Sequence, residues 1–384
     1  MTRVCLIFLK YPTPGRVKTR LAADLGAEGA AHAFRKMVAK VFEQCRRANP
    51  EVIAVCYDPP GQEEDVKKWL SPLLAAFPGK IEWIAQSDGD LGDRLEKGTA
   101  AVFEKYPESK VAVMGTDCVE IGTDIFKEVW SKIGEASDVV YGPTEDGGYY
   151  LVAMNQLQPA LFRDIAWSSE ETLSESLQAA AAAGLSTHLL PARTDIDTIE
   201  EWRPFDGKLS NRPCVFYDRD GVINRSPGPG YVLGWEDFYL NDGIAESLRI
   251  AKERGYLAII ITSQRGVGKG LMSQGELDRI HRNLQKELSE TGVGFDGIYA
   301  YTETDDCPHK AKPDPEMILS AAGDFFIEAT GSWMIGDADR DIEMGIRAGL
   351  KGTIRIVGDK AVGNEAEFTL NQITELPDLF KKIL

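Results

Sequence analysis

The stretch Cys214–Asn224, CVFYDRDGVIN, decides the fold class of the second half of the chain. Its first four residues form a strand-length apolar run, and the Asp-Arg-Asp-Gly that follows is a turn signal. Two carboxylates one residue apart can divide the work of a reaction, because one attacks while the other transfers protons. Asp218 is therefore the candidate nucleophile and Asp220 the candidate general acid/base. Taken alone, the stretch is also compatible with an acidic turn that performs no chemistry.

The sequence on either side of this turn alternates between strand-like and helix-like segments. The strands are expected at 214–217, 257–261, 297–301, 332–335 and 353–357, and the helices at 244–254, 274–291, 316–325 and 339–348. This alternation predicts a mostly parallel sheet covered by helices. Ligands of such sheets bind beyond the carboxyl ends of the strands.

Polar residues stand at those strand ends. Thr262 ends the second strand, Lys312 lies in a later loop, and Asp337 ends a further strand, with Asp341 one helical turn on. A carboxylate repels a phosphate unless a cation lies between them, and Mg²⁺, which prefers oxygen ligands, suits Asp218 and Asp337. The Thr262 hydroxyl and the Lys312 ammonium can stabilise a transferring phosphoryl group.

The motifs DRDGVIN, TSQRGVGKG, KPDP and GDADRD, in this order, resemble the four motifs of the haloacid dehalogenase superfamily. They are most similar to those of the histidinol-phosphate and heptose-bisphosphate phosphatases, over about residues 214–358. The resemblance implies a Rossmann-like phosphatase domain, and the segment between the first two motifs leaves no room for more than a minimal cap. It also implies roles for individual residues: Asp218 as nucleophile and metal ligand, Asp220 as acid/base and as ligand through its carbonyl, Thr262 and Lys312 as phosphate anchors, Asp337 as metal ligand. Asp341 is expected to support the ligands, or else to be an acid on a helix surface.

Two departures from that group affect the expected cofactor and substrate. The group carries a zinc loop of the form CxH followed by CxC, whereas here Cys307-Pro308-His309 runs straight into Lys310-Ala311-Lys312. The second pair of cysteines is absent, so this loop cannot supply a closed site of four zinc ligands, and zinc is not expected. Ala311 also stands where the group carries an arginine. Arg265, in the glycine-rich loop, is the candidate substitute for that substrate contact, with Lys269 beside it.

The first half of the chain shows the same alternation. Strands are expected at 4–9, 52–57, 81–85, 111–115, 139–141 and 149–153. In the segment 30–47, Phe34, Met37, Val41 and Cys45 recur at a helical period, which predicts an amphipathic helix. The two halves are therefore expected to be separate α/β domains.

A basic loop follows the first strand of this half. Gly15 allows a close turn, and Arg16, Lys18 and Arg20 stand at alternate positions. In an acidic chain this pattern favours an anion site suited to the phosphates of a nucleotide. The alternative is a solvated basic turn.

Acidic residues and glycines stand near other predicted strand ends of this half. Asp117 can hold a metal ion, the alternate residues Asp195 and Asp197 share one side of an extended segment, and Gly147 and Gly148 would admit a ligand closely. The remaining candidates for nucleotide binding are Asp90 and Asp146. Plain turn acids are the alternative for Asp195 and Asp197.

The motifs FLKYPTPGRVKTRL, GTDC, EDGGYYL and DIDT together resemble the glycosyltransferase-A-like family. They are most similar to its arsenosugar-type glycosyltransferase branch and, more distantly, to the phospholactate and molybdenum-cofactor guanylyltransferases. The resemblance covers about residues 4–202 and implies a nucleotide-binding domain that transfers a sugar or a nucleotide. It implies Asp117 and Asp197 as magnesium ligands, with Asp195 as the rival of Asp197, and basic-loop cations facing nucleotide phosphates. The chain has Gly-Thr-Asp at 115–117 in place of an Asp-x-Asp triplet.

The segment 204–213, PFDGKLSNRP, interrupts both patterns and predicts a linker between domains 1–203 and 214–384. The net charge of -17 disfavours a nucleic-acid partner. The apolar runs have strand length, so no membrane partner is expected, and the start of the chain lacks a secretory signal. Six scattered cysteines indicate reduced thiols. We expect a cytoplasmic protein.

Two functions remain open from the sequence. The first is a bifunctional enzyme: a Mg²⁺-dependent phosphatase, acting on a phosphorylated sugar or polyol through an aspartyl-phosphate intermediate, fused to a nucleotide-dependent glycosyl- or nucleotidyltransferase. In the second, the N-terminal domain only binds a nucleotide or a sugar phosphate. A scaffold of two decayed enzymes is disfavoured, because the candidate catalytic residues are all retained.

Overall fold

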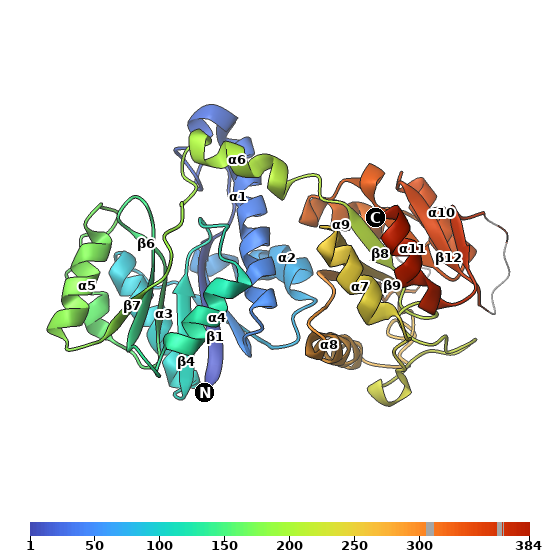
Figure 1. Ribbon diagram of the computed structural model, residues 1–384, viewed down its shortest axis with the longest axis horizontal. Coiled ribbons are helices and arrows are strands. Elements are labelled where there is room, and N and C mark those ends of the chain that lie inside the picture. The colour runs from blue at the N-terminus through green and yellow to red at the C-terminus, as the bar shows by residue number, and fades with distance from the viewer. Residues whose placement is uncertain (305–310, 359–362, 364) are drawn as a thin grey trace. The chain divides into compact units, whose positions relative to one another are not determined.

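The computed structural model describes residues 1–304, 311–358, 363 and 365–384. The chain divides into two compact units, Met1–Leu70 with Gly79–Gly207 and Ser71–Pro78 with Lys208–Leu384 (Figure 1). We call them the N-terminal and the C-terminal domain. The division after Gly207 falls inside the predicted linker, but the first half of that linker is helical, because α6 (Ile199–Leu209) runs through it.

The N-terminal domain contains a seven-stranded sheet in the order β3-β2-β1-β4-β6-β5-β7. Its strands are β1 (Thr2–Lys10), β2 (Val52–Asp58), β3 (Lys80–Ala85), β4 (Ser109–Met114), β5 (Val139–Pro143), β6 (Tyr149–Met154) and β7 (Thr187–Leu189). Its helices are α1 (Ala22–Arg47), α2 (Glu63–Leu74), α3 (Leu91–Lys105), α4 (Thr123–Lys132), α5 (Thr172–Ala182) and α6. Strand β6 is antiparallel to both β4 and β5, and the other pairs are parallel.

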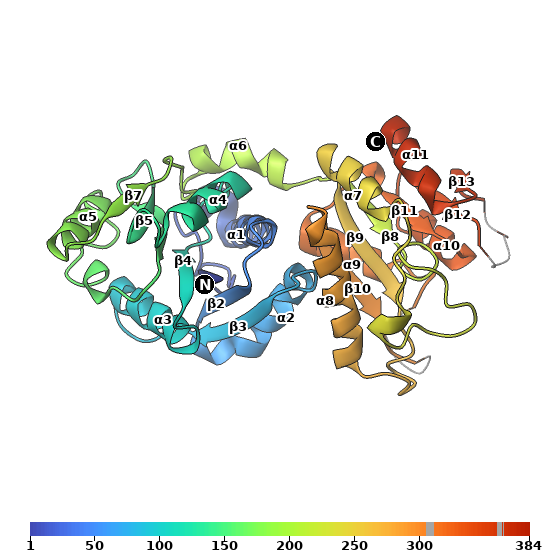
Figure 2. The same ribbon diagram turned by 60° about the horizontal axis from the view of Figure 1, so that its bottom comes forward.

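Helices cover both faces of this sheet. Leu95 of α3 and Ala180 of α5 belong to one core with Val4 and Leu6 of β1, whereas α1 and α4 lie on the opposite face (Figure 2). Because β1 is covered on both sides, it is a nearly continuous apolar run, as is usual for a central parallel strand.

The C-terminal domain contains a six-stranded parallel sheet in the order β10-β9-β8-β11-β12-β13. Its strands are β8 (Cys214–Tyr217), β9 (Leu257–Ser263), β10 (Gly297–Tyr301), β11 (Trp333–Gly336), β12 (Gly352–Ile356) and β13 (Phe368–Leu370). Its helices are α7 (Ile244–Glu253), α8 (Gln274–Glu290), α9 (Glu316–Phe325), α10 (Asp339–Arg347) and α11 (Leu376–Ile383). Helices α7, α8 and α11 pack on one face, where Leu248, Leu284 and Phe380 join the core of Val215 and Ile260.

The segment between β8 and α7 contains a single short 3-10 turn, Trp235–Asp237, and no inserted domain. The expected minimal cap is therefore confirmed for this segment. Two α/β domains with Rossmann-like sheets are also confirmed. The sequence analysis missed the strands β7 and β13 and the helices α2, α3, α4, α6 and α11. In the described part of the chain, no helix is both long and apolar enough to cross a membrane.

Candidate functional site

Residues from four separate segments of the C-terminal domain meet at the carboxyl edge of its sheet. Asp218 directly follows β8, Asp337 follows β11, and Asp341 lies in the first turn of α10. Lys312, from the loop before α9, places its Nζ 2.7 Å from Asp218 Oδ1 and 2.8 Å from Asp341 Oδ1. The side chains of all three bonded residues are at most 4% exposed. The parallel topology brings these residues together because it aligns all the strand ends at one edge.

The three carboxylates of Asp218, Asp337 and Asp341 form a buried cluster. One ligand oxygen from each lies within 4.8 Å of the others, and among the described residues this is the one such group of three. Gly221 makes the approach possible, since a side-chain carbon there would lie 2.1 Å from Asp337 Oδ2 and the backbone φ of +95° suits glycine. Three carboxylates face one lysine, so the cluster fits a hard divalent cation.

Burial and repulsion dominate the electrostatics of this cluster. Burial, and next the neighbouring Asp341 carboxylate, raise the pKa of Asp218 to about 7. Burial alone would lower the pKa of Lys312, but the Asp218 and Asp341 carboxylates outweigh it and hold that pKa above its usual value. A cation bound beside Asp218 would favour its ionised form, which is the form a nucleophile needs.

Asp220 lies in a hydrogen-bonded cage beside the cluster. Arg219 donates from Nη2 to Asp220 Oδ1 at 2.9 Å, Asn224 Nδ2 donates to the same oxygen at 3.0 Å, and Gln264 Nε2 donates to Oδ2 at 2.8 Å. Burial opposes the charged carboxylate, but Arg219 and the amide donors outweigh it and lower the pKa of Asp220. The ionised form that results is the one that can accept a proton from water.

The other predicted residues of this domain lie around the same edge. Thr262 is buried, and its Oγ1 accepts a hydrogen bond of 2.9 Å from Gln264 Nε2. Arg265 lies over the Tyr301 ring, 5.8 Å from its centroid, and Lys269 donates to the Tyr231 hydroxyl. Cys307 and His309, the half zinc loop, lie outside the described residues.

Burial decides between the two alternatives left open for Asp341. This residue is fully buried, which excludes the helix-surface alternative, and its position in the cluster makes it a third candidate metal ligand. The cage residues Arg219, Asn224 and Gln264 were not singled out as functional. For Gln264 a signal existed, because residues two apart on a strand point the same way and Gln264 follows Thr262 by two.

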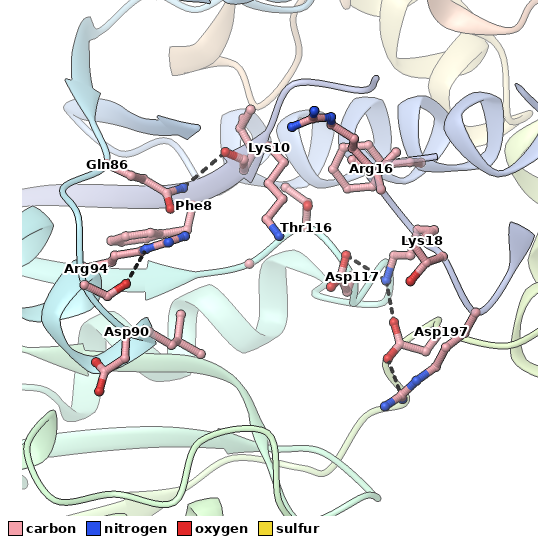
Figure 3. A pocket seen from close by; sticks show the side chains of 18 residues that line it. Phe8, Lys10, Arg16, Lys18, Gln86, Asp90, Arg94, Thr116, Asp117 and Asp197 are labelled. Atoms are coloured by element: carbon pink, nitrogen blue, oxygen red, sulfur yellow. Dashed lines mark hydrogen bonds and ion pairs between the residues drawn. The ribbon is translucent and has the colours of Figure 1, made fainter. Parts of the chain in front are cut away.

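The N-terminal domain contains a cavity of about 570 Å³ at the carboxyl ends of β1 and β4 (Figure 3). Five cationic side chains and three carboxylates line it: Lys10, Arg16, Lys18, Arg20, Arg94, Asp90, Asp117 and Asp197. Lys10, which directly follows the predicted strand 4–9, and Arg94, in α3, were not among the predicted contacts. A cavity with an excess of cations suits an anionic ligand.

Lys18 lies between the two acids predicted to hold magnesium. Its Nζ is 2.9 Å from Asp117 Oδ1 and 2.8 Å from Asp197 Oδ1, as Figure 3 shows. Burial opposes the charge on Lys18, but Asp117 and Asp197 outweigh it and raise its pKa. The position that a metal ion would take between these carboxylates is therefore taken by an ammonium group, and the predicted magnesium site does not fit this arrangement.

The remaining candidates of this domain serve its local structure. Asp90 caps α3, because its Oδ1 accepts from the Asp93 backbone N–H at 2.9 Å. Asp146 Oδ1 accepts from Thr144 Oγ1, and Gly147, at φ +88°, packs against the Glu170 backbone. Gly148 follows in the same turn, where its N–H donates to Asp146.

Asp195 and Gly15 are not among the residues that line the cavity, and neither are Asp146, Gly147 and Gly148. Burial, and next the Asp117 carboxylate, raise the pKa of Asp195 to about 7. The pKa of Asp195 is therefore strongly raised for a carboxylate. Within the described chain, Asp195 forms no cluster of three ligands with Asp117 and Asp197.

Two protein families match the chain. A family of uncharacterised proteins conserved in bacteria matches residues 41–169. The family of haloacid dehalogenase-like hydrolases matches residues 149–349, more than half of the chain. The chain belongs to the haloacid dehalogenase-like hydrolase family. The parallel sheet that carries its four motifs begins only at β8, so the start of this match lies in the N-terminal domain.

Curated relatives of this hydrolase include two heptose-bisphosphate phosphatases. The D-glycero-beta-D-manno-heptose-1,7-bisphosphate 7-phosphatase of Photorhabdus laumondii is 32% identical over 186 residues, which are 44% of this chain and 96% of the relative. The D-glycero-alpha-D-manno-heptose-1,7-bisphosphate 7-phosphatase of Burkholderia mallei is 37% identical over 160 residues, 40% of this chain and 82% of the relative. Each of these two relatives matches less than half of this chain, so neither gives information about the remaining residues.

Solved structures similar to this hydrolase include one for each kind of domain. A D,D-heptose 1,7-bisphosphate phosphatase from B. bronchiseptica, complexed with magnesium and phosphate, is 20% identical, with a TM-score of 0.41 and coverage of 44% of this chain and 98% of that one. A protein described provisionally as a nucleotide-diphospho-sugar transferase, from Desulfovibrio desulfuricans G20, is 28% identical. Its TM-score is 0.47, and the match covers 54% of this chain and 89% of that one.

Proposed function

We propose that this hydrolase is a bifunctional enzyme whose C-terminal domain removes the phosphate of a phosphorylated sugar or polyol. The observation that carries the proposal is the buried cluster of Asp218, Asp337 and Asp341 around Lys312, with Asp220 held beside it. The curated relatives named above act on heptose bisphosphates, which favours a sugar phosphate as substrate.

The reaction follows from the proposed roles of these residues. A carboxylate oxygen of Asp218 attacks phosphorus, and the bond from phosphorus to the sugar oxygen breaks. Asp220 carries a proton at this stage, gives it to the leaving oxygen and becomes ionised, and an aspartyl-phosphate remains on Asp218. Asp220 then accepts a proton from water, whose oxygen attacks phosphorus and releases inorganic phosphate and free Asp218.

The other polar residues assist this reaction. Lys312 and Thr262 stabilise the charge on the phosphoryl oxygens. A magnesium ion, when bound by Asp218, Asp337 and Asp341, would neutralise the repulsion between carboxylates and phosphate. Asp220 also offers its backbone carbonyl as a ligand. Arg265 is proposed to contact the substrate beyond its phosphate, in place of the arginine that the related phosphatases carry at position 311.

The phosphatase assignment is tested with p-nitrophenyl phosphate and a panel of sugar and polyol phosphates that includes heptose 1,7-bisphosphate. Asp218→Asn is expected to lower kcat by about 10³-fold or more, because the nucleophile is lost. Asp242→Asn, a change at an exposed acid of the same domain, is the matched control and should leave kcat near that of wild type. Magnesium-dependent hydrolysis undiminished in Asp218→Asn would refute the assignment.

For the N-terminal domain we propose binding of a nucleotide or nucleotide sugar, followed by glycosyl or nucleotidyl transfer. The cation-lined cavity of about 570 Å³ supports this proposal, since a nucleotide carries its charge on phosphates. Arg16, Lys18 and Arg20 are the proposed phosphate contacts. Calorimetry with GTP, CTP, UTP and UDP-sugars tests it. Binding without turnover of any donor would favour the simpler function of a binding module.

A further inference from the structure

The N-terminal cavity surrounds a buried ammonium group with two more exposed carboxylates. The Lys18 side chain is 4% exposed, whereas those of Asp117 and Asp197 are 45% and 43% exposed. Arg20 Nη1 lies 3.2 Å from Asp197 Oδ2, on the other carboxylate oxygen. Each carboxylate therefore already has a protein cation within contact distance. One of these cations, Lys18, is buried, so it cannot move into solvent without exposing the site around it.

The backbone around these three residues holds them in this arrangement. Lys18 has a φ of +47°, a conformation that a lysine adopts only where the surrounding structure imposes it. The Lys18 carbonyl accepts from the Ala22 N–H at 2.9 Å, at the start of α1. The Ile196 N–H donates to the Asp117 carbonyl at 3.0 Å, and the Asp197 N–H donates to Glu201 Oε2 at 2.8 Å. Backbone hydrogen bonds thus fix the segments that carry Lys18, Asp117 and Asp197, and they hold the ammonium group in position.

The charge balance differs from that of the C-terminal cluster. There, three carboxylates meet one lysine, whereas here Asp117 and Asp197 meet both Lys18 and Arg20. Lys10, Arg16 and Arg94 add further positive charge to the cavity wall. While Lys18 occupies the two carboxylates, a divalent cation is disfavoured at this wall and a diphosphate is attracted.

We propose that the N-terminal cavity binds the diphosphate group of a nucleotide or nucleotide sugar without a divalent cation, with Lys18 as the resident cation in the place of the metal. The identity of the ligand rests on the function proposed above, whereas the role of Lys18 does not. An ammonium group has three N–H donors. Two of them point to Asp117 and Asp197, and the third remains for a phosphate oxygen, since no other partner of Lys18 is found in the described chain. Asp117 and Asp197 then orient the ammonium and do not ligate a metal.

A count of bound Mn²⁺ tests the role of Lys18 without any nucleotide. The experiment uses the full-length Asp337→Asn variant, in which the C-terminal cluster is disabled, and follows free Mn²⁺ by electron paramagnetic resonance up to 1 mM metal. We expect no specific site in this variant. Adding Lys18→Met should create one site per chain, and adding Asp117→Asn to that pair should remove it again.

The single Asp337→Asn variant keeps this test decisive even if the Lys18→Met form fails to fold. A Mn²⁺ site in Asp337→Asn that disappears on adding Asp117→Asn would overturn the proposal, because it would show that metal displaces Lys18. Lys18→Arg retains the charge and is the matched control, and it should leave the N-terminal site without Mn²⁺.

Calorimetry with UDP, GDP and inorganic pyrophosphate tests the ligand. Wild-type protein should bind at least one of these with dissociation constants that agree within about threefold in EDTA and in 5 mM MgCl₂, and Lys18→Met should weaken the binding at least tenfold. Binding that is lost in EDTA would overturn metal independence but leave the proposed nucleotide function standing. If neither buffer supports binding of any of the three, or of the nucleotides tested above, the proposed function and the diphosphate assignment both fail.

Discussion

Both domains contain a buried lysine that bridges two aspartates, and the surroundings of the two bridges differ. Lys312 joins Asp218 and Asp341, and all three side chains are at most 4% exposed. Lys18 joins Asp117 and Asp197, whose side chains are nearly half exposed. The C-terminal bridge has Asp337 as an additional carboxylate, whereas the N-terminal bridge has Arg20 as an additional cation.

The comparison teaches that aspartates at strand ends can lie in quite different balances of charge. The two groups of carboxylates differ in the net charge that remains after the protein's own cations are counted. They also differ in their exposure to water. The C-terminal cluster keeps an excess of negative charge in a buried place, where the interaction with a cation is strong. The N-terminal pair is already neutralised.

The largest expected effect is on magnesium-dependent activity. Asp337→Asn should lower phosphatase kcat by about 10³-fold, because the metal supplies several kcal/mol of transition-state stabilisation. It should also abolish the rise of the thermal midpoint with added MgCl₂. Asp117→Asn should leave the rise of the thermal midpoint with MgCl₂ unchanged. A loss of this rise in Asp117→Asn would contradict the proposed difference between the two lysine bridges. Phosphate release and thermal unfolding are the measurements.

The next effect separates the two lysines by stability. Lys312→Met should lower the free energy of unfolding of the C-terminal domain by about 3–5 kcal/mol in EDTA, because it leaves buried carboxylates without a cation. Lys18→Met should cost about 1 kcal/mol, because Asp117 and Asp197 reach solvent and Asp197 keeps Arg20. Hydrogen exchange, measured for individual peptides at a series of urea concentrations, gives the free energy of unfolding of each domain separately.

The exposed Lys286 provides the matched control, and Lys286→Met should change stability by less than about 0.5 kcal/mol. Equal losses for Lys312→Met and Lys18→Met would show that burial of the partner carboxylates does not distinguish the two bridges.

A smaller effect concerns the cage around Asp220. Gln264→Leu removes a donor to the Asp220 carboxylate and should raise its pKa, since that donor favours the charged form. With p-nitrophenyl phosphate, whose leaving group needs no acid, activity depends on ionised Asp220. The acidic limb of the kcat profile should therefore move to higher pH by up to about one unit.

The control for this change is Gln274→Leu, at an exposed glutamine that bonds Asp278 at the start of α8. It should leave the profile where it is. An acidic limb that stays in place in Gln264→Leu would mean that another group, such as Asp218, sets it.

The last effect is a pH dependence of stability in the N-terminal domain. Burial and Asp117 raise the pKa of Asp195 to about 7 in the folded protein, so the unfolded chain loses this proton first. The group therefore lowers stability as pH rises from about 4 to about 7. The free energy of unfolding of Asp195→Asn should equal that of wild type at pH 4 and exceed it by on the order of 1–3 kcal/mol at pH 8. Urea unfolding at the two pH values measures it, and a gain of equal size at pH 4 would contradict the assignment.

Much of the fold was predictable because strand and helix periods are local properties. The strands from β1 to β6 and from β8 to β12 coincide with apolar runs visible in the sequence. The short edge strands β7 and β13 were missed, since three residues carry too little pattern. The linker was misjudged because Pro204 and Gly207 weaken a helix without preventing it, and α6 continues through both.

The sequence by itself determined that Asp218, Thr262, Lys312 and Asp337 belong to one edge of a parallel sheet. The motif order and the strand period place each residue at a strand end or in an adjacent loop, and parallel pairing aligns those ends. It also determined that a basic loop follows β1. These conclusions depend only on residues that are near one another in the chain.

Only the tertiary structure decided how the charges are paired. Lys18 meets Asp117 and Asp197 across 99 and 179 positions of sequence, and buried Asp341 meets Lys312, which comes from a separate loop. Whether a carboxylate faces a cation, another carboxylate or water depends on distances and burial that no local pattern encodes. Since these distances set the residual charge, they determine how much negative charge each acidic group keeps beside its lysine.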